Sequence, residues 1–368
     1  MRSSGPSLDA TTTPAPTTAP CSTARNSYTR LARAPSMFGD SPGPSTTLSI
    51  PVFNTLGVRS AADTTVPLGG GSGATKIAEN GCTLPADRVF FNYNQYAGVL
   101  ATTRPTIPTP TPVGDGRYGT YTLGVERTFL DGDASVEVRM PFHDDLGANF
   151  PGYQATIGNV GNLAVYLKTL LYADEGLAVG AGIAGILPTG NDLRVDSPFL
   201  NFEMRNEAVH LAPYLAALYV PDDDWFVQGF IQGDFAANGN TIFTNNRAIE
   251  QGVYTEQNLL LLDLSLGRWL YHDPNAERFV GAALVFELHY TTTLQDTDVV
   301  PFGVPTFPPS NAAVFNSLNR LDVLNATVGC NFLLTPSSNL RIGAGAPVTG
   351  ARDRLFDGEF QVSFNQYY

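Results

Sequence analysis

Charged residues are scarce in this chain, at 15% of its 368 residues, and long apolar runs are lacking although 43% of the residues are apolar. No stretch approaches the ~18–20 consecutive apolar residues of a transmembrane helix. The 3.6-residue periodicity of amphipathic helices is almost absent as well. Because backbone polar groups must be satisfied internally in lipid, a chain without long helices can cross a membrane only as a closed β-barrel.

A basic excess is also lacking, since the formal net charge is −13. Nucleic-acid binding needs a basic footprint, so we expect no nucleic-acid partner. Cysteine is rare, and Cys21, Cys82 and Cys330 show neither metal-ligand spacing nor a disulfide framework. We therefore predict no metal and no cofactor.

Twelve strand-like runs follow one another between Val89 and Tyr368. Most are about ten residues long, the length that a tilted strand needs to span a bilayer. The runs are Val89–Tyr96, Tyr118–Phe129, Ala134–His143, Leu163–Tyr172, Leu177–Leu187, Val209–Tyr219, Trp225–Phe235, Leu260–Leu266, Ala282–Tyr290, Leu324–Phe332, Leu340–Pro347 and Phe356–Tyr368.

The connections between these runs alternate between long and short. The short ones are Asp131–Asp133, Asp174–Gly176, Pro221–Asp224, Asp273–Glu277 and Pro336–Ser338. The long ones include residues 101–117, 144–162, 188–208, 237–258 and 295–317. This asymmetry is typical of outer-membrane barrels, in which short turns face the periplasm and long loops face the outside.

Period-2 alternation assigns each side chain to the lipid or to the lumen, most clearly in the last run. Phe360, Val362 and Phe364 share one parity, whereas Asp357 and Glu359 share the other. Because a carboxylate in lipid costs energy, the acidic parity must face the interior. Aromatic residues collect near the short turns, where an interfacial girdle would lie, namely Phe129, Tyr172, Tyr219, Trp225, Trp269, Tyr271, Phe279, Tyr367 and Tyr368.

The sequence thus predicts an all-β fold: an antiparallel up-and-down transmembrane β-barrel of about twelve strands over residues 87–368. Residues 1–45 are rich in Ser, Thr, Pro and Ala and are expected to be disordered, and no export signal is identified there. Residues 46–86 are expected to be a linker or a periplasmic or plug segment. We expect a location in the bacterial outer membrane, contact with its lipids, and recognition of the C-terminal strand by the barrel-assembly machinery.

The inward parity defines a set of candidate pore-lining residues. The set is Glu126, Glu137, Arg139, Lys168, Gln228, Gln232, Asp234, Asp263, Glu287, His289, Asn325, Arg341, Asp357 and Glu359. Charged rings in a lumen set ion preference, and this set is mildly acidic. The function predicted is passive diffusion of small solutes through a polar lumen. Two alternatives stay open: a non-conducting barrel with a structural or adhesive role through its long loops, and a soluble β-rich protein.

Motifs for catalysis or binding give weaker predictions. Gly180–Gly185 matches GxGxxG but lies inside a strand with no helix to follow, so no nucleotide site is predicted. GxSxG is absent, and His210 and His289 point inward by parity. No enzyme is predicted. The run Asp222–Asp224 lacks the spaced oxygen ligands of a calcium loop and is interpreted as a turn.

Two segments carry a resemblance to known families. Lys76–Asn80 with Pro85–Asn94 is similar to the start of the first strand in a family of uncharacterised bacterial outer-membrane barrel proteins. Gly185–Asp192 resembles the Leu-Pro-Thr-Gly element of barrels grouped with the phenol-degradation meta-pathway transporters and related porins. The resemblance covers roughly residues 76–368, and the chain departs from it at Gly81–Leu84. It implies an outer-membrane location and passage of small molecules, including hydrophobic ones, and it carries over no substrate.

Overall fold

Within the residues that it describes, the computed structural model of the chain contains β-strands and two short 3₁₀ turns, η1 (Leu31–Arg33) and η2 (Leu130–Gly132). The residues it describes are 30–40, 45–53, 59–67, 75–99, 117–144, 148–150, 153–156, 158–196, 200–245, 248–304, 310–316, 319–350 and 354–368. Within these ranges, no helix is long and apolar enough to cross a membrane.

Twelve strands form one closed antiparallel barrel, as the sequence predicts. In chain order they are β3 (Arg88–Ala97), β4 (Tyr118–Phe129), β5 (Ala134–His143), β8 (Leu163–Ala173), β9 (Leu177–Leu187), β12 (His210–Tyr219), β13 (Trp225–Ala236), β16 (Leu259–His272), β17 (Gly281–Thr293), β20 (Asp322–Thr335), β21 (Ser338–Pro347) and β22 (Gly358–Tyr367). Each strand pairs with its neighbours in the chain, and β22 closes the ring against β3, with Val362 opposite Tyr93.

The alternation of side chains along the strands explains why the sheet closes. In β12 every second residue is buried and the residues between are exposed. Outward-facing Leu215, Ile231 and Leu264 keep about half of their surface accessible, at 54%, 54% and 52%. Such exposure of large apolar side chains would be unfavourable in water, and it fits a wall that faces lipid. The closed barrel with this apolar exterior is the architecture of an outer-membrane protein.

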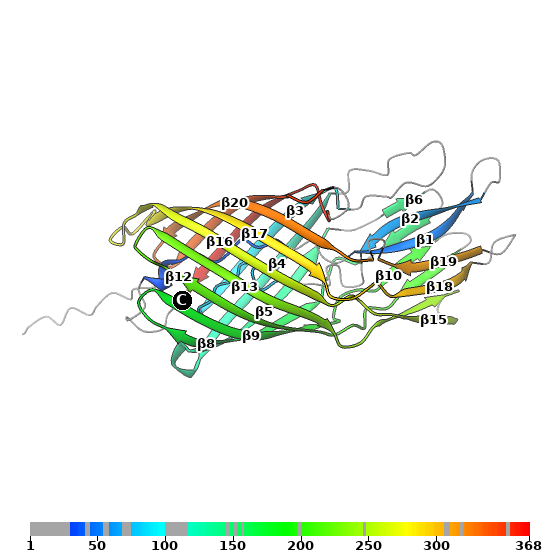
Figure 1. The fold of residues 1–368 in the computed structure, drawn as a ribbon, viewed down its shortest axis with the longest axis horizontal. Coiled ribbons are helices and arrows are strands. Elements are labelled where there is room, and N and C mark those ends of the chain that lie inside the picture. The colour runs from blue at the N-terminus through cyan, green and yellow to red at the C-terminus, as the bar shows by residue number, and fades with distance from the viewer. Residues whose placement is uncertain are drawn as a thin grey trace, which may run out of the picture.

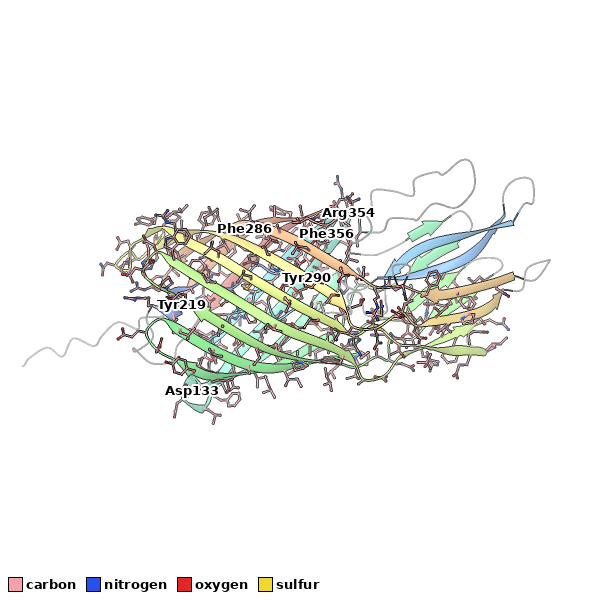
Figure 2. All side chains as sticks on the ribbon, viewed as in Figure 1. Asp133, Tyr219, Phe286, Tyr290, Arg354 and Phe356 are labelled. Atoms are coloured by element: carbon pink, nitrogen blue, oxygen red, sulfur yellow. The ribbon has the colours of Figure 1, made fainter. Side chains whose placement is uncertain are left out.

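The short connections and the C-terminus lie at one end of the barrel (Figure 1). Asp222 in the turn after β12 accepts hydrogen bonds from the backbone N–H groups of Asp224 and Trp225, at 2.9 and 2.8 Å, which confirms the turn interpretation of this acidic run. Tyr219 is exposed on the outer surface at this end (Figure 2). Trp269 and Tyr367 differ from the predicted girdle, because both are buried. Trp269 lies inside the barrel, where it packs against Phe226 at 6.2 Å between ring centroids.

The other end of the barrel carries an outer layer of two sheets, formed by the long connections and by the chain before the barrel (Figure 1). One sheet has the order β15-β14-β11-β10-β7-β6 and the other β18-β19-β1-β2. The strands are β1 (Ser45–Phe53), β2 (Arg59–Pro67), β6 (Ala148–Phe150), β7 (Tyr153–Thr156), β10 (Leu193–Asp196), β11 (Asn201–Met204), β14 (Asn240–Thr244), β15 (Ile249–Tyr254), β18 (Val299–Val304) and β19 (Ser310–Phe315).

The two sheets of the outer layer share an apolar core. Phe202 of β11 stacks on Phe302 of β18 at 5.4 Å between ring centroids. Phe356, next to the mouth of the barrel, packs against Tyr96 of β3 at 5.5 Å in the same core. Phe356 shares the parity of Phe360, Val362 and Phe364 in the last predicted run, which would place it toward lipid. The structure contradicts this because β22 begins only at Gly358, so the alternation does not extend back to Phe356.

Candidate functional site

The lumen of the barrel contains two stretches of the N-terminal chain, residues 30–40 and 75–87, which together we name the plug. The first stretch begins at the short-turn end, where Arg30 contacts Asp223 at 3.3 Å. The hairpin β1–β2 between the two stretches lies in the outer layer, where Thr47 pairs with Phe315 of β19. The first stretch therefore ascends through the lumen, from the short-turn end toward the outer layer. After the hairpin in the outer layer, the second stretch descends toward the short-turn end, where β3 begins.

The plug differs from the prediction for the N-terminal region. Residues 30–40 fall within the segment expected to be disordered, yet Leu31, Met37 and Phe38 are almost fully buried in the barrel. Their apolar side chains supply the burial that a purely polar segment cannot provide. Residues 1–29 of the same predicted segment lie outside the described residues.

Two glutamines of β13 bind the backbone of the descending stretch. Gln232 accepts a hydrogen bond from the N–H of Ile77 at 2.7 Å and donates one to the carbonyl of Thr75 at 2.8 Å. Four residues earlier in β13, and on the same face, Gln228 accepts from the N–H of Thr83 at 3.3 Å. Because a barrel wall has no free strand edge, side-chain amides replace the backbone partners that the plug would find in a sheet.

The ascending stretch is bound by the opposite wall. Arg341 donates two hydrogen bonds from Nη1 to the carbonyls of Ser36 and Met37, at 2.6 and 2.7 Å. Gln361 donates to the carbonyl of Gly39 at 2.7 Å. Both side chains are fully buried, and these hydrogen bonds give Arg341 Nη1 and the Gln361 amide nitrogen partners in the plug.

Phe38 fixes the height of the plug through two glycines of the wall. A Cβ built on Gly329 or Gly343 would meet the Phe38 ring at 2.4 or 2.9 Å, so only glycine leaves space for the ring. The guanidinium of Arg341 lies over the ring, 4.9 Å from its centroid. The N–H groups of Phe38 and Gly39 both donate to the carboxylate of Glu287, each at 2.9 Å.

An ionic cluster of β3, β4, β5 and β8 holds the foot of the plug, residues 80–87. Arg88 donates to the carbonyl of Asn80 at 2.9 Å, and Glu126 accepts from the N–H of Ala86 at 3.2 Å. Arg88 donates to Glu126 at 2.8 Å and to Glu137 at 2.9 Å. Lys168 pairs with Glu126 at 2.8 Å, and Arg139 pairs with Glu137. All five side chains are buried, and three positive charges face two negative ones. Since each carboxylate is neutralised by direct contact, this part of the wall offers no acidic surface to a solute.

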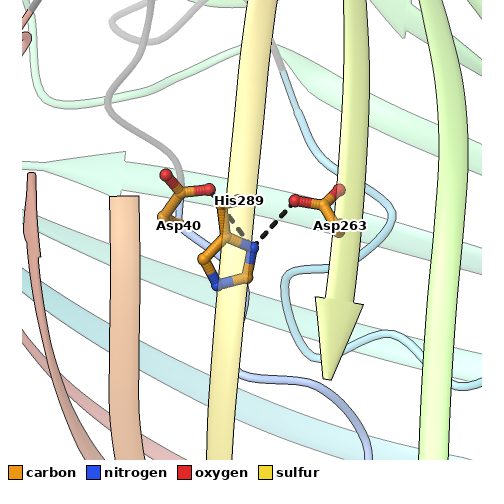
Figure 3. A group of neighbouring side chains, drawn as sticks. All are labelled: Asp40, Asp263 and His289. Atoms are coloured by element: carbon orange, nitrogen blue, oxygen red, sulfur yellow. Dashed lines mark hydrogen bonds and ion pairs between the residues drawn. The ribbon is translucent and has the colours of Figure 1, made fainter. Parts of the chain in front are cut away.

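A second charged group lies higher in the lumen, where β16 and β17 meet the plug (Figure 3). His289 Nδ1 lies 2.8 Å from Asp263 and 3.6 Å from Asp40 of the plug. The ammonium of Lys76 pairs with Asp40 and lies 3.7 Å from Asp263. Asn325 of β20 donates to the other oxygen of Asp40.

One sector of the wall is apolar, which the inward parity of charged residues alone does not indicate. Tyr166, Tyr214 and Phe230, from β8, β12 and β13, pack in one buried cluster with Met37 and Ile77 of the plug. The lumen therefore combines an aromatic sector with a charged one, and the plug matches both.

All but one of the predicted pore-lining residues are buried on the inner face of the barrel. They are Glu126, Glu137, Arg139, Lys168, Gln228, Gln232, Asp234, Asp263, Glu287, His289, Asn325, Arg341 and Glu359. Asp357 is the exception: its side chain is 54% exposed and pairs with Arg354 at 2.8 Å. It precedes the first residue of β22, so the strand parity does not apply to it.

Several residues of the site were missed by sequence reasoning. Arg88 is the central cation of the ionic cluster, and its place as the first residue of β3 with inward parity was the available signal. Asp40 and Lys76 of the plug have no signal of their own, because both lie outside any strand. The apolar residues Leu31, Met37 and Phe38 within a Ser/Thr/Pro-rich segment were the only hint that this segment is buried.

Comparisons with known proteins find similarity among solved structures. No family model matches the chain, and no curated protein matches it. An outer membrane channel from Pseudomonas putida F1 is 13% identical with a TM-score of 0.48, covering 77% of this chain and 97% of that one. The translocator domain of the autotransporter NalP from Neisseria meningitidis is 10% identical with a TM-score of 0.48, covering 77% and 89%. The NanC porin is 9% identical with a TM-score of 0.42, covering 76% and 99%. The fold assignment itself rests on the closed strand order.

Proposed function

We propose that the protein is a non-enzymatic outer-membrane channel for small solutes, and that its own N-terminal plug closes the lumen. The observation that carries this proposal is how the plug is held. Most of its polar contacts are hydrogen bonds between wall side chains and plug backbone, as at Gln232 and Arg341. Such bonds exchange for bonds to water at a net cost of only ~0.5–1.5 kcal/mol each.

Displacement of the plug would open a lumen with two kinds of surface. The predicted pore-lining residues would then meet water. The paired charges of β3, β4, β5 and β8 would lie next to the aromatic sector of Tyr166, Tyr214 and Phe230, since Arg139 lies over the Tyr166 ring. A lumen with an aromatic sector suits solutes that have apolar parts. Because the carboxylates Glu126 and Glu137 are already paired, we propose weak rather than strong cation preference.

A second candidate function is a non-conducting barrel with a structural or adhesive role. It is favoured by the outer layer, whose two sheets form a core of their own and include the hairpin β1–β2. In that case the plug would be a permanent part of the barrel interior. We also propose that β22, which closes the barrel against β3, is the strand recognised during assembly.

The test is single-channel recording of the full chain in planar bilayers, with a variant that loosens the plug without removing a charge. Gln228→Leu/Gln232→Leu removes hydrogen bonds to Thr75, Ile77, Gly81 and Thr83. At ~1 kcal/mol for each lost bond, the four bonds weaken closure by about 4 kcal/mol, so we expect the open fraction to rise at least tenfold. Leu264→Ala, on the lipid-facing wall, is the matched control and should leave it unchanged.

Two results would separate the candidates. Discrete current steps that become more frequent in the double variant support a channel closed by the plug. Folded and inserted protein that carries no current in either form contradicts the channel and favours the non-conducting barrel. Folding of each form is checked by the heat-dependent shift of the barrel on a gel.

A further inference from the structure

The charged group at the top of the plug contains a set of atoms spaced for a metal ion. One oxygen each of Asp40 and Asp263 and one ring nitrogen of His289 lie within 4.8 Å of one another, and all three residues are buried. In a tetrahedral zinc site with bonds of ~2.0–2.2 Å, ligand atoms lie about 3.3 Å apart. The distances from His289 Nδ1 to the oxygens of Asp263 and Asp40, 2.8 and 3.6 Å, lie on either side of this value.

The two ring nitrogens of His289 lie in different surroundings. Its Nδ1 faces the two aspartates, while its Nε2 lies 3.2 Å from Glu287 without making a hydrogen bond. Metal-binding histidines usually donate their far N–H to a carboxylate, and Glu287 is the carboxylate beside that nitrogen. Glu287 is itself held by the N–H groups of Phe38 and Gly39, so its position is fixed by the plug.

Two buried oxygens of the group provide a second, independent observation. Asp263 Oδ2 and Asn325 Oδ1 have no hydrogen-bond partner in the part of the chain that the structure describes. Both side chains are at least nine-tenths buried. An unpartnered carboxylate oxygen in such a place is costly, and a cation would remove the cost. Asp263 Oδ2 or Asn325 Oδ1 would also be available to the cation as a fourth ligand.

Lys76 supplies the only ammonium within ion-pair distance of this group among the described residues. It neutralises one negative charge, whereas Asp40, Asp263 and Glu287 carry three. A divalent ion beside the aspartates would repel the Lys76 ammonium, so the ion and the ammonium must compete for the same two carboxylates. Lys76 therefore sets the affinity of the site rather than excluding it.

We propose that Asp40, Asp263 and His289 form a binding site for a divalent transition-metal ion of the zinc class. One imidazole nitrogen with carboxylate oxygens suits zinc, whereas calcium would need six to eight oxygens. Asp40 belongs to the plug, while Asp263 and His289 belong to β16 and β17. The bound ion would tie the plug to the wall, so metal and plug stability are coupled. This inference does not depend on whether the barrel conducts.

The barrel contains a matched control in a second buried histidine. His210 Nδ1 lies 2.7 Å from Asp234, and its Nε2 lies 3.5 Å from Glu256. Here each ring nitrogen faces a single carboxylate, whereas His289 Nδ1 faces two. The pair has the same residue types and burial, but no third ligand converges with it among the described residues. His210→Gln should therefore leave zinc binding unchanged.

The experiment measures zinc bound to the full chain, refolded in detergent and stripped with a chelator, by equilibrium dialysis and elemental analysis. We expect one zinc ion per chain. His289→Gln and Asp263→Asn should each weaken binding at least tenfold, and Glu287→Gln should weaken it 10- to 100-fold, the usual range for a residue that orients a ligand. Lys76→Met should tighten binding, because it removes the competing ammonium. Tetrahedral Co²⁺ should give ligand-field absorption in the wild-type chain without any substitution.

Three outcomes would overturn the proposal. They are no retained zinc in either the wild-type chain or Lys76→Met, equal binding in wild type and in both His289→Gln and Asp263→Asn, and loss of binding in His210→Gln alone. The gel shift of the folded barrel confirms that each variant compared is folded. Where a ligand variant does not fold, the Co²⁺ spectrum of the wild-type chain and its change in Lys76→Met decide the question.

Discussion

The lumen and the outer layer both bring the N-terminal region against the barrel, but with a different balance of polar and apolar contacts. In the lumen, Gln232, Arg341 and Glu287 bind the plug by hydrogen bonds to its backbone. In the outer layer, two sheets meet through apolar side chains such as Phe202 and Phe302.

This difference indicates which of the two contacts can be undone. A buried hydrogen bond contributes ~0.5–1.5 kcal/mol net, since water offers a replacement partner. A large apolar side chain contributes ~1.5–3 kcal/mol on burial, with no replacement in water. The outer layer should thus remain folded under conditions in which the plug exchanges. The charged cluster at the foot of the plug and the buried side chains of Leu31, Met37 and Phe38 are the exceptions. Buried charges are costly to leave without partners, and apolar side chains find no replacement contact in water.

The largest change in the free energy of unfolding is expected at Arg88, which belongs to the buried ionic cluster. Arg88→Met removes the cation between Glu126 and Glu137 and leaves two buried carboxylates with fewer partners. Loss of one partner of a buried ion pair costs ~3–5 kcal/mol, so the free energy of unfolding should fall by about that amount. Denaturant unfolding of the detergent-refolded chain measures it.

A rescue variant distinguishes lost charge pairing from lost packing. Adding Glu126→Gln and Glu137→Gln to Arg88→Met should recover much of the stability, because no buried carboxylate then lacks a cation. If Arg88→Met alone lowers the free energy of unfolding by less than ~1 kcal/mol, the cluster does not hold the foot of the plug.

A substitution in the outer layer tests whether its apolar core is independent of the barrel. Phe202→Ala removes a ring that is 1% exposed and stacks on Phe302. Such a truncation costs ~3–5 kcal/mol when the cavity does not collapse. The cost is expected at the lower end here, because the layer lies outside the barrel wall and can relax. Hydrogen exchange should increase in β10, β11 and β18 while the barrel strands keep their protection. Equal loss of protection in β3 and β22 would mean that the two regions are not independent.

The barrel could be predicted from the sequence because the alternation within each strand shows which side chains face the lipid and which face the lumen. Alternation in β13 and β17 placed Gln232 and Glu287 inside, and the structure places them there. Asp357 was misplaced because parity holds only within a strand, and nothing in the sequence marks Gly358 as the first paired residue. The side chains of the wall were thus predictable, and the end of the last strand was not.

The plug could not be predicted in the same way. Its residues have no periodicity, since 76–87 are buried at every position. Its conformation depends on local devices, as at Gly39, whose φ of +72° and close approach to the Glu79 backbone favour glycine. The partners of the plug lie far away in the sequence: Asp40 contacts Asn325, and Asn80 contacts Asn365. Such contacts follow from the closed barrel and cannot be derived from single segments.

The smallest effect is expected for a charge pair in the outer region that lacks burial. Arg320 donates to Asp296 at 2.6 Å, but the two side chains are 58% and 66% exposed. Exposed pairs contribute ~0–1 kcal/mol because solvent and salt screen them. Arg320→Gln should therefore change the free energy of unfolding by less than ~1 kcal/mol, and the change should vanish at high salt. The same measurement on Arg88→Met should be nearly independent of salt, since that cluster is buried. If salt changed the effect of both substitutions, the cluster at the foot of the plug would have to be hydrated. Its charges would then contribute as little to stability as the exposed pair of Arg320 and Asp296 does.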